Sequence, residues 1–105
     1  MTEVVLVLST APDDPSAEAL ARTLVDEKLA ACVNVLAPMV SIYRWKGAVE
    51  QSAERQLVIK TTRGLVPALG KRLKALHTYE LPELIVISVD GGATNYLDWI
   101  EMATK

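Results

Sequence analysis

Cys32 and His77 each occur once in the chain, and they are the side chains best suited to bind a soft or borderline metal ion. Thiolate and imidazole groups are ligands that copper favours, and zinc accepts both. Neither residue lies in a C-x-x-C, H-x-x-x-H or E-x-x-H motif, so the sequence contains no pre-spaced site for one metal ion. Each also has a simpler interpretation. Cys32 suits a small residue buried at the start of a strand, and His77 suits a helix C-terminus, where its ring hydrogen-bonds a free carbonyl.

Tyr43 and Trp45 form a second candidate site. They are two residues apart on a predicted strand, so their side chains project from the same face. Lys60 lies on the partner strand in a largely apolar run, and its ammonium is costly to bury alone. We therefore expect Lys60 to reach a carboxylate, a carbonyl or a bound anion. Sheet packing and contacts between subunits are the simpler explanation for the two aromatic residues.

Alternating strand and helix patterns predict the elements that hold these residues. Asp14 and Pro15 supply an N-cap and a first helical position, Lys46-Gly47 supplies a hairpin turn, and Asn95 can cap a short last helix. Residues 51–55 are polar and fit either a loosely paired extension of the return strand or a loop. The expected strands are 4–9, 32–36 with 40–46, 56–62 and 84–89, and the expected helices follow residue 14, span 64–76 and follow residue 95. This order predicts an α+β, ferredoxin-like βαββαβ fold with an additional C-terminal helix.

Length and composition limit the classes of function. The 105 residues allow a single domain, 1–105, and half of them are hydrophobic, which favours association of more than one chain. A net charge of −2 argues against binding to nucleic acid through phosphate neutralisation. One cysteine cannot form an internal disulfide, no run approaches the length of a membrane span, and the N-terminal residues resemble a strand rather than a signal peptide. We therefore expect a cytoplasmic protein without a membrane partner.

Four segments, in this order, resemble the divalent-cation tolerance (CutA) family over almost the whole chain. They are Leu29-Ala-Ala-Cys-Val-Asn-Val-Leu, Ser41-Ile-Tyr-Arg-Trp-Lys-Gly, Ile59-Lys-Thr-Thr and His77-Thr-Tyr-Glu-Leu-Pro-Glu. Thr78 departs from the proline that the family usually has there. The resemblance implies a homotrimer with a ligand cleft between neighbouring subunits, and it places around that cleft Tyr43, Trp45, Lys60, His77, Tyr79 and Glu80.

Three functional hypotheses follow. The first, implied by the resemblance, is a non-catalytic homotrimer for divalent-cation tolerance. It requires no cofactor and binds a divalent cation, copper or less favourably zinc, through Cys32 and His77. The alternative is a trimeric signalling or scaffold module that binds a small anionic metabolite in the inter-subunit clefts. The third is an enzyme that uses His77 and Glu80, but no set of nucleophile, base and orienting group can be assigned, so we expect no catalysis.

Overall fold

Strand β4 (Ala48–Thr62) is the longest element and organises the sheet. The computed structural model describes residues 2–105, and the other elements in that range are β1 (Val4–Pro12), α1 (Pro15–Asp26), β2 (Cys32–Val35), β3 (Met39–Trp45), the 3-10 turn η1 (Arg63–Leu65), α2 (Val66–Leu76), β5 (Ile85–Ser88) and α3 (Thr94–Ala103). They form one antiparallel sheet and three α-helices, which confirms the predicted α+β class. No helix among these residues is long and apolar enough to cross a membrane.

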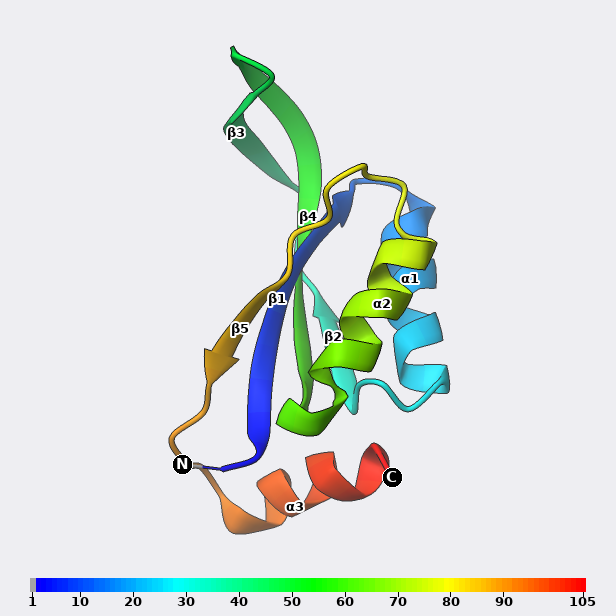
Figure 1. Ribbon diagram of the computed structural model, residues 1–105, viewed down its shortest axis with the longest axis vertical. Helices are drawn as coiled ribbons and strands as arrows, with labels where there is room; N and C mark the ends of the chain where they lie inside the picture. The colour runs from blue at the N-terminus through cyan, green and yellow to red at the C-terminus, as the bar shows by residue number, and fades with distance from the viewer. Residues whose placement is uncertain (1) are drawn as a thin grey trace.

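The sheet has the order β2-β4-β1-β5, and β3 pairs with the first half of β4. The predicted turn is confirmed: Lys46 and Gly47 both have positive φ angles, 49° and 82°, as a type I′ hairpin turn requires. The turn fixes the register of β3 on β4. The polar residues 51–54 pair with β3 and Arg55 pairs with β1, so the segment is strand and not a loop. Because β3 and this half of β4 extend beyond the rest of the sheet, the hairpin projects from the molecule (Figure 1), whose longest axis measures 44 Å.

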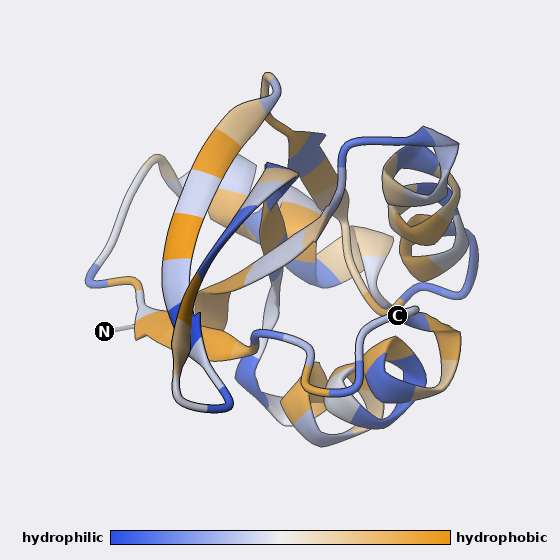
Figure 2. Ribbon diagram, turned by 90° about the horizontal axis from the view of Figure 1, so that it is seen from above, coloured by the Kyte–Doolittle hydropathy of each residue, from blue (hydrophilic) through white to orange (hydrophobic). Residues whose placement is uncertain are grey.

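Helices α1 and α2 cover one face of the sheet (Figure 1). Alternate strand residues point toward them and are completely buried, among them Val5, Val7, Leu57 and Ile59. This alternation is visible in Figure 2, where orange hydrophobic segments of the strands follow paler or blue ones. The core is therefore the layer between the two helices and the odd-numbered residues of β1 and β4.

The opposite face of the sheet, which we call the open face, has helical cover only at one end. There α3 packs Ile100 against Val4 and Ala31, as the position of α3 in Figure 1 suggests. Further along, β5 presents Ile85 and Ile87 with 51% and 40% of their surface exposed. Strand β5 pairs with β1 on one side only, so within residues 2–105 its other edge is unpaired. The exposed apolar side chains of the open face therefore lie beside an unpaired strand edge.

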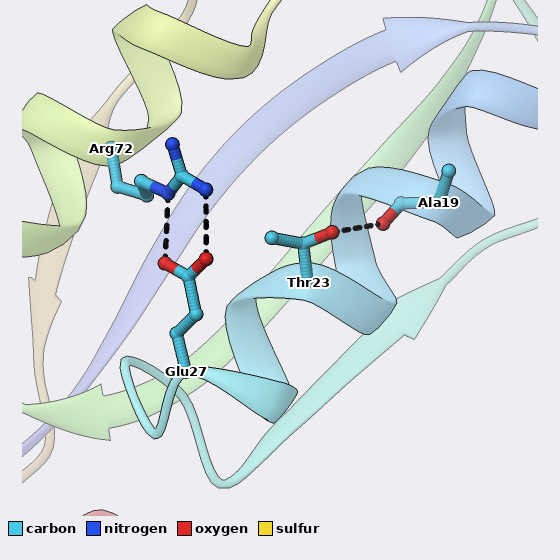
Figure 3. Close-up of polar contacts among 4 residues, drawn as sticks. All are labelled: Ala19, Thr23, Glu27 and Arg72. Carbon is cyan, nitrogen blue, oxygen red and sulfur yellow. Dashed lines mark hydrogen bonds and ion pairs between the residues drawn. The ribbon is translucent and has the colours of Figure 1, made fainter.

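Local contacts explain where the helices begin and how they are joined. Asp14 accepts a hydrogen bond from the Ser16 N–H at 2.8 Å, which confirms the predicted N-cap of α1. The predicted cap at Asn95 is wrong, because α3 begins at Thr94 after an N-cap at Ala93 that has no side-chain bond. The guanidinium of Arg72 binds the Glu27 carboxylate through two bonds of 2.8 Å and so links α2 to the end of α1 (Figure 3).

Replacing Leu73 by alanine tests the core between α2 and the sheet. Leu73 is fully buried, so the substitution leaves a cavity and should lower the free energy of unfolding by about 2 to 5 kcal/mol. The measurement is urea unfolding at a fixed protein concentration. The control Lys71→Ala, at an exposed position on the same helix, should change it by less than about 0.5 kcal/mol. Equal effects of the two variants would contradict this packing.

The cap at Asp14 should make helix stability depend on pH. The hydrogen bond from Ser16 lowers the pKa of the Asp14 carboxyl in the folded chain, so its stabilisation is present above the unfolded pKa and is lost as the pH falls through the folded pKa. The melting temperature of Asp14→Ala should therefore lie below that of the wild type at neutral pH, and the gap should close in acid. The control Asp13→Ala removes a neighbouring carboxylate that precedes the N-cap. A gap that is constant from neutral to acid pH would rule out the carboxylate cap.

Candidate functional site

The structure divides the predicted site residues between two ends of β4. Lys60 lies near the C-terminal end of the strand, directly opposite Cys32 of β2. Tyr43 and Trp45 lie opposite Glu50 and Ala48 near its start. At about 3.3 Å per residue, Lys60 is about 30 Å along the strand from the position opposite Tyr43. Within one chain, therefore, Lys60 does not belong to the same cleft as the two aromatic residues.

At one end, Cys32 and Lys60 share the open face. Cys32 is a free, half-buried thiol, and its register places it beside Lys60 on the side away from α1 and α2. The Lys60 ammonium donates a hydrogen bond to the Tyr96 hydroxyl at 3.3 Å and lies 5.7 Å from the centroid of the same ring. The sequence predicts a carboxylate, carbonyl or anion as the partner of Lys60. The structure provides a phenol of α3 instead.

His77 is the C-cap of α2, and both of its ring nitrogens are engaged. The Tyr79 N–H donates to Nδ1 at 3.1 Å, so Nδ1 is unprotonated and the ring proton is on Nε2. Nε2 then donates to the Thr10 carbonyl at 2.6 Å, which places the ring against the end of β1 rather than on a carbonyl of its own helix. Any metal that binds His77 must displace one of these two bonds.

Cys32 and His77 lie apart in a single chain. Cys32 is opposite Lys60, whereas His77 contacts Thr10, which pairs with Gln56 from the other side of β4. Among residues 2–105 there is no group of three His, Cys, Asp or Glu side chains close enough to hold a metal ion.

At the other end, a cleft of about 780 Å³ opens between the β3–β4 hairpin and the segment that leads into β5. Four of the six predicted cleft residues line it, namely Tyr43, Trp45, Tyr79 and Glu80. Its other lining residues include Ser41, Ser52, Glu54, Gln56, Glu83 and Leu84. Within one chain the structure thus brings the aromatic pair together with the segment that follows α2, without Lys60 and His77, and adds the acidic residues Glu54 and Glu83.

Glu54 is the most unusual of these residues, because its charged side chain is only 8% exposed. The Tyr79 hydroxyl donates to its Oε2 at 2.6 Å. Burial of the ring raises the pKa of Tyr79 well above its ordinary value, and the bond to Glu54 raises it further. The sequence gives little signal for this contact, because Glu54 lies in a polar run, Gln51-Ser-Ala-Glu-Arg, with no local mark of burial.

Removing the Tyr79 hydroxyl tests this contact. Tyr79→Phe leaves a buried carboxylate without its donor and should lower the free energy of unfolding by about 1 to 3 kcal/mol. In a spectrophotometric titration, the variant should also lose the tyrosine that ionises at the highest pH. Tyr96→Phe serves as the control, because Tyr96 is exposed and lies at the other end of the sheet. If Tyr96→Phe removed the last tyrosine to ionise, the assignment to Tyr79 would be wrong.

Comparison with known proteins gives one consistent family. Residues 5–103 match the model of the CutA1 divalent ion tolerance protein family. The chain is 44% identical over 104 residues to the divalent-cation tolerance protein CutA of Thermus thermophilus, with 99% of each chain covered. It is 40% identical over 101 residues to a chloroplastic CutA protein of rice, of which it spans 57%.

Solved structures agree with this match. The crystal structure of CutA from Xylella fastidiosa superimposes with a TM-score of 0.95 at 49% identity, covering 99% of this chain and all of the other. The structure from Thermus thermophilus gives a TM-score of 0.93 at 42% identity. Sequence and fold agree over nearly every residue, and the chain belongs to the CutA family of divalent-cation tolerance proteins.

Proposed function

We propose that the chain is a cytoplasmic, non-catalytic homotrimer that contributes to divalent-cation tolerance by binding copper and, less favourably, zinc. The family name supports the connection with divalent cations. The observation that carries the proposal is the position of Cys32, a free thiol on a sheet face that the chain itself leaves largely uncovered. A thiolate at that position can take part in a copper site once another chain covers the face.

Assembly is supported by the exposed apolar side chains of the open face. Ile85 and Ile87 of β5 are both more than a third exposed on this face, and the outer edge of the strand is unpaired within residues 2–105. Such an edge is a template for pairing with another chain, and an apolar face gains by burial. The strand order β2-β4-β1-β5 with two helices on one face agrees with a ferredoxin-like arrangement, and three such chains are what the resemblance implies.

A trimer also changes what the two soft ligands can do. Cys32 and His77 are apart within one chain, but three copies of each allow the thiol of one chain to meet a ligand of the next. Cys32 is the primary ligand in this proposal, and His77 is a secondary one because binding would cost it a hydrogen bond. A catalytic role for His77 has little support for the same reason, since its nitrogens serve the backbone.

Nothing in the cleft favours the alternative, an anionic metabolite. Lys, Arg and His side chains are absent from the lining that the structure describes over residues 2–105, whereas Glu54, Glu80 and Glu83 are present. Within one chain, Lys60, the cation expected there, lies at the other end of β4. An anion in this cleft would face carboxylates, which disfavours its binding.

Light scattering after size exclusion tests the assembly. The wild type should have three times the 11.4 kDa chain mass, and Ile87→Glu should shift it toward the mass of one chain, because a charge on the open face opposes burial. The control Val25→Glu places the same charge on an exposed position of α1 and should leave the mass unchanged. A wild type that remains a folded single chain at micromolar concentration would contradict the proposal.

Calorimetric titration with copper under anaerobic conditions tests the ligand. Wild type should bind copper more tightly than zinc, and Cys32→Ser should weaken copper binding by about tenfold or more, because a hydroxyl is a poor ligand for a soft metal. His77→Gln separates the contribution of the second residue. Circular dichroism and the assembled mass confirm that both variants fold. Unchanged stoichiometry and affinity in Cys32→Ser would exclude the thiol from the site.

A further inference from the structure

We draw no further inference here: the strongest candidate, the groove of about 350 Å³ between α1 and β2 whose lining includes Arg22, Val25 and Val33, lies along an edge of β2 that no strand within residues 2–105 pairs with, and nothing in the structure shows what covers it.

Discussion

Strand β4 pairs along its length with β1, β2 and β3, and its register determines where every candidate site residue lies. Odd-numbered residues such as Leu57, Ile59 and Thr61 are completely buried on the helix side, whereas Glu54 and Lys60 share the opposite side. A slip of one residue would exchange the two sets and place charges in the core, so the hydrophobic pattern enforces this register. Contacts at the strand's end reinforce it: Thr61 donates to the Leu29 carbonyl at 2.7 Å, and the Ala31 N–H donates to the Lys60 carbonyl at 2.9 Å. These bonds hold the segment before β2 against the end of β4, and so they position Cys32, the first residue of β2.

One strand therefore positions two different groups of polar side chains. Its C-terminal end places a thiol and an ammonium on the open face, which carries exposed apolar side chains. Its middle places a buried carboxylate in a cleft built from the projecting hairpin and the segment after α2. Glu54 and Lys60 lie on the same face of β4, so the assembly proposed above would cover both.

Local chemistry made much of the fold predictable. Asp14-Pro15 predicts the start of α1, Lys46-Gly47 predicts the hairpin, and the spacing of Leu69 and Leu73 predicts α2, because caps, turns and helical stripes depend on neighbours in sequence. Features that depend on distant partners were less accessible. Residues 51–54 are strand because β3 pairs with them, and Arg55 pairs with β1. Helix α3 begins without a side-chain cap. The buried Glu54 takes its hydrogen bond from Tyr79, which is distant in sequence. The resemblance groups Tyr43 and Trp45 with Lys60, whereas the location of Lys60 within one chain follows from the register of β4 on β2.

The central claim is that the metal binds at the Cys32 thiol, where another chain covers the open face. Anomalous diffraction at the copper edge, from crystals of the assembled protein soaked with copper, tests it most directly. The account predicts a copper peak at bonding distance from the Cys32 sulfur, at a contact between chains, and none in the cleft at Glu54. A peak among the cleft carboxylates, or a Cys32 that faces solvent in the assembly without copper, would contradict it.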